Sequence, residues 1–516
     1  MRYKRTIREL IEHRAEVTPD FIFGIHEDDD RQISFGELEV CVNRLANGLA
    51  KLGMVQGQRV AVMLGNHPDH IFTFFALAKL GVIWVPVNVN LRGPSLDFLI
   101  EQTIPSAIIV DSKFWDRLEP CLSKRTIERI IIRNPVISLK SMNAVDFVEV
   151  AQGDAVPPPP TPTLDEIRCI SFTSGTTGPP KGALLTERML RACATGAGMA
   201  SDVCPGDVFL LWEPIYHNSG AQMCILALME PVTLVIVPRF SASHFWDQIK
   251  RYKVTKIHYL GGVIDILLKY PARPNDKNHS VEIAFGGGCG ADSWRAFEER
   301  FGVKIREVYG LTEASGFTIL NTSGKVGSIG KPYPYFEVQI VDDHGKPLQA
   351  NQIGEIVVRE KEPGLITQGY LDNQEATAAA LRNNCLYTGD LGRFDDEGDF
   401  YYMGRKKDSI RRRGENISAW EVERVLNSHP DIKESAVIGV DAEIGEQELK
   451  AFVVCAAGAT LEPLDIIRWC QPRMPYFHIP RYVAFVDSFE KTPTERIRKE
   501  NLSNDISDCW DLEKSG

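Results

Sequence analysis

The chain has 516 residues, of which 44% are hydrophobic and 25% are charged, a composition typical of globular proteins. This length exceeds what one hydrophobic core usually organises, so we expect at least two domains. A formal charge of −11 argues against a general nucleic-acid-binding protein. The N-terminus lacks the apolar core of a signal peptide, and the 11 cysteines show no metal-ligand spacing. We therefore expect a cytoplasmic protein with free thiols.

The first part of the chain alternates between helical and strand patterns. Thr6-x-x-Glu9 and Ser34-x-x-Glu37 are capping boxes that predict helices. Apolar runs predict buried strands at 59–64, 82–87 and 107–110, with helices between them. This alternation indicates βαβ units and a parallel sheet.

A proline-rich connector at 152–163 leads into residues 171–182, whose sequence is SFTSGTTGPPKG. Glycines allow backbone N–H groups to face a ligand, hydroxyls add donors, and Lys181 adds a positive charge. Lys181 follows two prolines and does not open a helix, so this is not a P-loop NTPase motif. We expect a polyphosphate-binding loop between two strands, with a Ser/Thr/Gly surface loop as the alternative.

Strand and helix patterns resume after this loop and predict a second doubly wound sheet. From Val326 onward, short β segments predict a small barrel-like subdomain. A charged run then covers residues 405–413, and we place a domain boundary near Asp408. The expected fold is α/β, with a large N-terminal domain at 1–407 and an α+β domain at 408–516, about 100 residues and a typical domain size.

Three later stretches carry groups that suit a nucleotide. Tyr309-Gly-Leu-Thr-Glu313 combines a ring that can stack on a base with a carboxylate that can hold Mg²⁺. Glycines at 286–288 let a flat ligand approach closely. Asp390 can accept two ribose hydroxyls, and Arg405 can donate to ribose or phosphate. Taken singly, each stretch is equally explained as a turn or a solvated surface group.

Together, these stretches resemble the adenylate-forming superfamily, in order and over nearly the whole chain. The matching segments are 173–181, 309–313, 387–390, 404–408 and 492–494. This superfamily includes acyl-CoA synthetases, carrier-loading adenylation domains and firefly-type luciferases. Residues 240–246 and 413–418 are similar to the branch of carnitine/crotonobetaine-CoA ligases.

The resemblance implies that ATP activates a carboxylic acid to an acyl-adenylate and that CoA then displaces AMP. The implied products are acyl-CoA, AMP and pyrophosphate, and no protein nucleophile takes part. ATP, Mg²⁺ and CoA are the implied cofactor and co-substrates, no nucleic acid is involved, and self-association stays open. The C-terminal domain is implied to be a mobile lid that rotates about Asp408 between the two steps.

The resemblance also implies roles for individual residues. The residues implied to bind the nucleotide are Thr173, Ser174, Gly175, Thr176, Thr177, Gly178, Lys181, Gly287, Gly288, Tyr309, Gly310, Thr312, Asp390 and Arg405. The acid is assigned to His217, Tyr259 and Gly288, CoA to Arg413, Gly414 and Glu415, and Mg²⁺ to Glu313. The residues implied to act in catalysis are Lys181, Thr312, Glu313, Arg496 and His217.

One departure from the family pattern bears on catalysis. The family usually has Gly-Lys after its final Thr-Pro-x, whereas here Glu495 and Arg496 stand at those positions. Arginine keeps the charge but is longer and planar. Either Arg496 replaces the lysine, or Lys491 or Lys499 does, or adenylation is impaired. The alternatives to a CoA ligase are therefore an enzyme that loads a carrier protein and a nucleotide-binding protein with impaired turnover.

The acid itself is poorly specified by the sequence. Candidate pocket residues are mostly apolar or aromatic, namely Trp212, Ile215, Tyr216, Met223, Tyr259 and Val263. An aromatic wall can hold a quaternary ammonium group by cation–π attraction, with Glu213 assisting. The alternative is that these side chains are part of the hydrophobic core.

Overall fold

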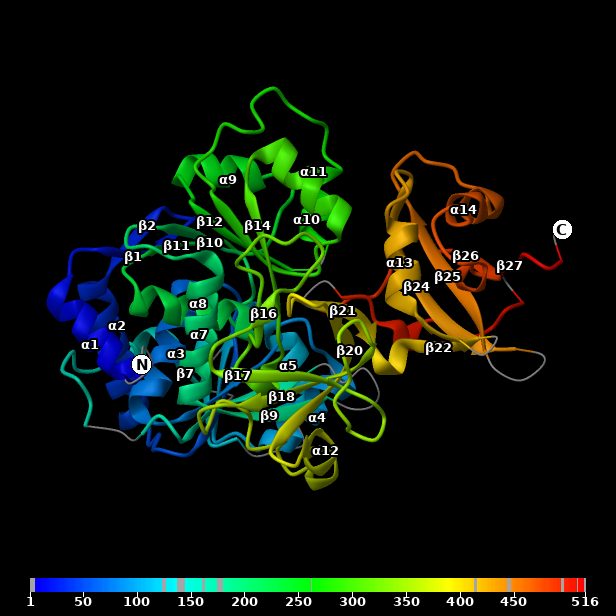
Figure 1. Ribbon diagram of the computed structural model, residues 1–516. Helices are drawn as coiled ribbons and strands as arrows, with labels where there is room; N and C mark the ends of the chain where they lie inside the picture. Colours follow the sequence, from blue (N-terminus) through cyan, green and yellow to red (C-terminus); the bar gives the residue numbers. More distant parts are fainter. Residues whose placement is uncertain are drawn as a thin grey trace.

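The structure is a computed structural model that describes residues 5–122, 127–136, 144–159, 163–173, 180–260, 262–412, 415–442, 447–492, 496–507 and 509–514. Within these residues, two large sheets, one five-stranded sheet and a separate C-terminal unit can be followed in chain colour (Figure 1). The helices are distributed over the faces of the two large sheets. The residues expected to bind phosphate at 174–178, namely Ser174, Gly175, Thr176, Thr177 and Gly178, and two of those expected to bind CoA, Arg413 and Gly414, lie outside the described residues.

The first large sheet has seven strands in the order β7-β6-β5-β3-β4-β8-β9. Their bounds are β3 Arg59–Met63, β4 Ile83–Pro86, β5 Ala107–Asp111, β6 Arg129–Arg133, β7 Ala144–Asp146, β8 Ile167–Thr173 and β9 Lys181–Thr186. All neighbouring pairs are parallel except β8 and β9. The expected strand–loop–strand is therefore an antiparallel hairpin at the edge of this first sheet.

The second large sheet has nine strands in the order β16-β15-β14-β13-β12-β10-β11-β1-β2. Their bounds are β1 Ile22–His26, β2 Arg31–Ser34, β10 Val208–Leu211, β11 Thr233–Ile236, β12 Lys256–Leu260, β13 Ile283–Gly287, β14 Lys304–Tyr309, β15 Ile319–Leu320 and β16 Lys331–Pro332. The β1–β2 hairpin was not predicted. It comes from the N-terminal end of the chain, yet β1 pairs with β11 in parallel.

Helices cover both faces of each large sheet. Their bounds are α1 Ile7–Val17, α2 Phe35–Lys51, α3 Pro68–Leu80, α4 Gly93–Thr103, α5 Trp115–Leu122, α6 Phe147–Val150, α7 Glu187–Ser201, α8 Asn218–Met229, α9 Phe245–Tyr252, α10 Val263–Leu268 and α11 Ala291–Phe301. Helices α3, α7 and α8 are buried around nearly their whole circumference. One hydrophobic cluster joins them to strands of both sheets, so they form the layer between the sheets. The expected doubly wound architecture is confirmed.

A five-stranded antiparallel sheet follows, with strands β17 Phe336–Val341, β18 Gly354–Glu360, β19 Leu381–Arg382, β20 Cys385–Phe394 and β21 Phe400–Arg405, and with helix α12 Gln374–Ala380. It is the barrel-like subdomain expected from the short β segments after Val326. In Figure 1 it lies between the large sheets and the C-terminal unit. Its strand β20 carries Asp390, and the paired strand β21 ends at Arg405.

The chain after Asp408 forms a compact α+β unit with its own hydrophobic cluster. Its elements are β22 Ser409–Arg412, β23 Glu415–Ser418, α13 Ala419–Asn427, β24 Ile432–Asp441, β25 Gln447–Cys455, α14 Pro463–Cys470, β26 Tyr482–Phe485 and β27 Trp510–Asp511. Ser418 stands at the N-cap of α13 but makes no side-chain cap hydrogen bond, unlike Thr6, which forms a full capping box with Glu9.

Candidate active site

The phosphate-loop hairpin brings Thr173 and Lys181 opposite each other at its mouth. The Thr173 hydroxyl donates to the backbone carbonyl of Lys181 at 3.3 Å. The Lys181 ammonium lies 5.2 Å from the centre of the Tyr370 ring. The hairpin therefore fixes the start and the cation of the expected loop, while residues 174–179 between them are outside the described part.

The turn Thr312–Ala314 places Glu313 against the same tyrosine. The Tyr370 hydroxyl donates to Oε1 of Glu313 at 2.7 Å, so one ring contacts both this carboxylate and Lys181. A single carboxylate beside a phosphate loop is the kind of ligand that Mg²⁺ takes together with phosphate oxygens, so the residues fit that ion. The sequence analysis did not single out Tyr370, because it lies on a connecting segment with no motif around it.

Tyr309 and Arg405 both contact the Asp390 carboxylate. The Tyr309 hydroxyl donates to Oδ2 at 2.6 Å, and the Arg405 guanidinium forms an ion pair with Oδ1 at 2.8 Å. Burial raises the pKa of Asp390, and the nearby Arg405 charge opposes that rise. Tyr309 lies 81 positions before Asp390 and 96 before Arg405, and the pairing of β20 with β21 places Asp390 and Arg405 opposite each other.

Gly288 and Tyr259 share one buried carboxylate. The Gly288 N–H, in a backbone with φ of +102°, donates to Oε1 of Glu307 at 2.5 Å. The Tyr259 hydroxyl donates to the other oxygen, also at 2.5 Å. A side chain on Gly286 would collide with the Tyr259 carbonyl oxygen at 1.9 Å, so glycine is required there. Tyr259 is fully buried, and its hydroxyl contacts the same Glu307 side chain as the Gly288 N–H.

His217 is the N-cap of α8 and lies at the end of the loop formed by residues 212–216. Its Nδ1 accepts from the backbone N–H of Ser219 at 3.2 Å. Burial, together with a smaller effect of the nearby Arg496 charge, lowers the pKa of His217 to about 4. The imidazole is therefore neutral at pH 7. Asn66 holds the preceding loop, because its amide accepts from the Ile215 N–H and donates to the Glu213 carbonyl.

Arg496 is an exposed residue of the C-terminal segment. Its positive charge acts to lower the pKa of both His217 and Asp390. Lys491 forms an ion pair with Glu434 at 2.6 Å, and Lys499 forms one with Glu423 at 2.6 Å. Both lysines are thus engaged in ion pairs within the C-terminal unit.

Comparisons with known proteins decide the family. A model described as AMP-binding enzyme matches residues 11–371, and one described as AMP-binding enzyme C-terminal domain matches residues 421–496. The chain belongs to the AMP-binding enzyme family. The resemblance to adenylate-forming enzymes stated from the sequence is therefore confirmed.

Individual relatives agree with this assignment along the length of the chain. A crotonobetaine/carnitine–CoA ligase from Salmonella choleraesuis (strain SC-B67) is 31% identical over 510 residues, covering 96% of this chain and 99% of its own. An o-succinylbenzoate CoA synthetase from Bacillus subtilis, solved with an acyl-adenylate intermediate, has a TM-score of 0.84 at 26% identity over 97% of this chain and 99% of its own. The anthranilate CoA ligase AuaEII, solved with anthranoyl-AMP, shares the fold with a TM-score of 0.88 at 24% identity, over 96% of both chains.

The reaction class expected from the sequence is confirmed with the family. This AMP-binding enzyme is an AMP-forming acid–thiol ligase that uses ATP, Mg²⁺ and CoA. Its other substrate is a small carboxylic acid. In the part of the chain that the structure describes, no helix has the length and apolar character needed to cross a membrane.

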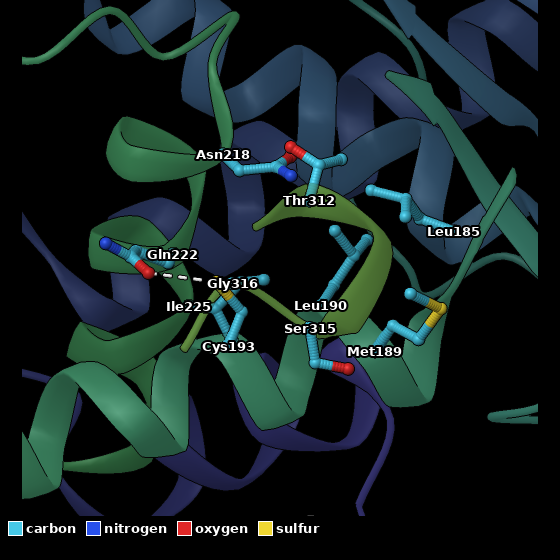
Figure 2. A pocket seen from close by; sticks show the side chains of 10 residues that line it. All are labelled: Leu185, Met189, Leu190, Cys193, Asn218, Gln222, Ile225, Thr312, Ser315 and Gly316. Atoms are coloured by element: carbon cyan, nitrogen blue, oxygen red, sulfur yellow. Dashed lines mark hydrogen bonds between the residues drawn. The ribbon is translucent and has the colours of Figure 1, made fainter. Parts of the chain in front are cut away.

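A small cavity of the AMP-binding enzyme lies between α7, α8 and the Thr312 turn (Figure 2). Its volume is about 10 Å³, room for about one water molecule. Asn218, Gln222 and Thr312 line it together with aliphatic side chains, and Cys193 donates to Gln222 at 2.9 Å.

Trp212, a candidate for an aromatic wall around the acid, donates its indole N–H to the His258 carbonyl and packs in the core. This is the alternative that the sequence analysis left open for it.

Glu307 gives a testable pH dependence of stability. Burial raises its pKa from 4.5 to about 7. Between these values the native state holds a proton that the unfolded chain has released, so the free energy of unfolding falls as pH rises, by up to about 1.4 kcal/mol per pH unit. We expect Glu307→Gln to remove this part of the slope in urea unfolding measured from pH 4.5 to 8. Glu337→Gln, at a side chain that is 43% exposed, is the control, and an unchanged slope in Glu307→Gln would contradict the assignment.

Proposed function

We propose that the groups described above divide the two half-reactions between them. Tyr309 stacks on adenine, Asp390 and Arg405 hold the ribose, and Gly287 and Gly310 give the nucleotide a close backbone surface. Thr173, Lys181 and the loop residues 174–178 hold the two terminal phosphates. Support comes from their position, because Tyr370 joins Lys181 to Glu313 while Tyr309 joins the β14 end to Asp390.

In the first step, a carboxylate oxygen of the acid forms a bond to the α-phosphorus, and the bond from that phosphorus to pyrophosphate breaks. Two anions must meet, so positive charge and donors at the α-phosphate lower the barrier most. Arg496 and Thr312 supply them in our proposal, and neutral His217 lines the acid channel with Gly288 and Tyr259. When bound at Glu313, Mg²⁺ supplies further positive charge to the phosphate oxygens.

In the second step, the CoA sulfur forms a bond to the acyl carbonyl carbon, its proton is released, and the bond to AMP breaks. We propose that 408–516 is a separate domain that rotates about Asp408 for this step. Arg413, Gly414 and Glu415 then face CoA. Such a rotation would complete a different site for each half-reaction.

The observation that carries the proposal is the cluster in which Tyr370 contacts both Lys181 and Glu313, while Tyr309 and Arg405 contact Asp390. The test is release of pyrophosphate and AMP with CoA and a panel of acids: short, medium and long fatty acids, aryl acids and trimethylammonium acids. Release that depends on acid and CoA supports the ligase. Transfer only to a purified carrier protein would favour the carrier-loading alternative, and ATP binding without any release would favour the impaired one.

For the acid, we propose a compact molecule with a cationic group, as the name of the Salmonella relative suggests. Glu213 is fully buried, one of its oxygens contacts His258, and the other has no hydrogen-bond partner within the described residues. A buried carboxylate of this kind favours a positive group nearby.

Glu213→Gln tests the cationic group directly. We expect kcat/KM for a trimethylammonium acid to fall by about tenfold or more, since a charge-assisted contact contributes roughly 1.5–3 kcal/mol. For the neutral acid of the same length and branching, kcat/KM should change less than threefold. Equal losses for both acids would contradict the proposal and indicate that Glu213 only supports the loop.

We also propose a reducing, cytoplasmic location. All eleven cysteines fall in the described part of the chain and stand there as thiols, several of them buried. Thiols of this number persist where glutathione and thioredoxin keep the compartment reduced.

A further inference from the structure

Lys269, the residue that follows α10, contacts the C-terminal unit. Its ammonium donates to the backbone carbonyls of Ile432 at 2.9 Å and Lys433 at 2.6 Å. These two carbonyls belong to the start of β24, on the far side of the proposed boundary at Asp408. In Figure 1 the C-terminal unit stands beside α10 and α11, with α13 and β24 toward them.

A β-bulge explains how one ammonium reaches two consecutive carbonyls. In a regular strand, successive carbonyls point to opposite edges. Between Ile432 and Glu434, the pairing of β24 with β25 shifts by one residue. A bulge bends the strand and leaves the extra residue outside the ladder, which frees its backbone groups for another partner. Lys269 is that partner.

The same bulge is tied to the segment that carries Arg496. Glu434, at the end of the bulge, forms an ion pair with Lys491 at 2.6 Å. Lys491 pairs with Ile497 as an isolated β-bridge, and the Thr492 N–H donates to the Arg496 carbonyl at 2.7 Å. A chain of direct contacts therefore runs from α10 through β24 to Arg496.

We propose that Lys269 is a positioning residue for acid activation, which holds the C-terminal unit so that Arg496 enters the acid and nucleotide site. This inference rests on the proposed function. Lys269 touches neither substrate nor nucleotide. Its partners are neutral carbonyls and its side chain stays partly in solvent, so the contact can break when the C-terminal unit rotates for CoA transfer.

The experiment compares the two half-reactions in Lys269→Met. We expect acid-dependent pyrophosphate release to fall tenfold or more, while thioester formation from supplied acyl-AMP and CoA stays within twofold of wild type. Lys269→Arg, which can still donate to both carbonyls, should keep at least a third of the activity. Lys277→Met removes a nearby exposed lysine and should leave both rates unchanged. Equal losses in both half-reactions, or no loss, would overturn the proposal.

Two further measurements separate this inference from the proposed function. Hydrogen exchange at the amides of 490–498 should become faster in Lys269→Met and not in Lys277→Met, whether or not any acid is turned over. In an active enzyme, Lys269→Met and Lys491→Met should combine to much less than the product of their separate effects, because both act on the same contact chain. Unchanged hydrogen exchange at 490–498, or effects of the two substitutions that multiply fully, would contradict the proposed chain of contacts. A wild type that releases no pyrophosphate with any acid would overturn the proposed function alone.

Discussion

Arg496→Ala is expected to slow acyl-adenylate formation by about 10²–10³-fold, the usual effect of removing one group that stabilises transition-state charge. Arg496 brings its positive charge to His217 and Asp390 from the C-terminal unit. The measurement is a single-turnover assay of acid-dependent pyrophosphate release at saturating ATP. Thioester formation from supplied acyl-AMP should stay within about threefold of wild type, because the attack of CoA on the carbonyl no longer requires two anions to meet.

Arg496→Lys is the control for charge. It has the residue type that the family usually carries, but its shorter side chain grips one oxygen at a time. We expect it to recover at least tenfold of the lost rate. Arg498 lies two residues further on and pairs with Glu490. Arg498→Ala should therefore leave adenylation nearly unchanged. Loss of both half-reactions in Arg496→Ala, to the same degree, would contradict the role that we propose for Arg496.

Asp390→Ala is expected to raise the KM for ATP by about 10²-fold. The substitution would remove the carboxylate that accepts charge-assisted hydrogen bonds from the ribose hydroxyls. It should also lower the free energy of unfolding by about 3 kcal/mol, the low end for breaking a buried pair, since the Arg405 side chain stays 31% exposed. ATP titration of activity and urea unfolding at pH 7 measure the two effects.

Asp390→Asn separates these two effects. The amide oxygen can still accept from the Tyr309 hydroxyl, while the ion pair with Arg405 is lost. We expect an intermediate KM for ATP and a smaller loss of stability than in Asp390→Ala. If Asp390→Ala destabilised the protein without changing the KM for ATP, Asp390 would be a structural residue and the ribose would be held elsewhere.

Much of the fold follows from local patterns. Apolar runs with glycine punctuation located β3, β5 and their helices, and the Thr6 capping box formed as predicted, because these features depend on contacts within a few residues. The β1–β2 hairpin was beyond such reasoning. Its pairing with β11 joins residues 24 and 234, and only the packing of the whole layer selects that edge over others.

The candidate site divides in the same way. Ordered motifs predicted roles for Lys181, Tyr309, Glu313 and Asp390, since each lies in a short stretch with several functional groups. Tyr370, Glu307 and Asn66 were not identified. Each acts through a contact with a residue far away in the sequence, and a single tyrosine, glutamate or asparagine carries no local signal of that contact.

The sequence by itself determined the family and the reaction class, because these depend on motifs in a fixed order. Tertiary structure alone decided which of the candidate cations are held in ion pairs. Lys491 and Lys499 are equally charged in the sequence, but ion pairs with Glu434 and Glu423 hold both within the C-terminal unit. The packing of that unit sets these contacts between residues far apart in the chain, and it leaves Arg496 as the cation that we propose for acid activation.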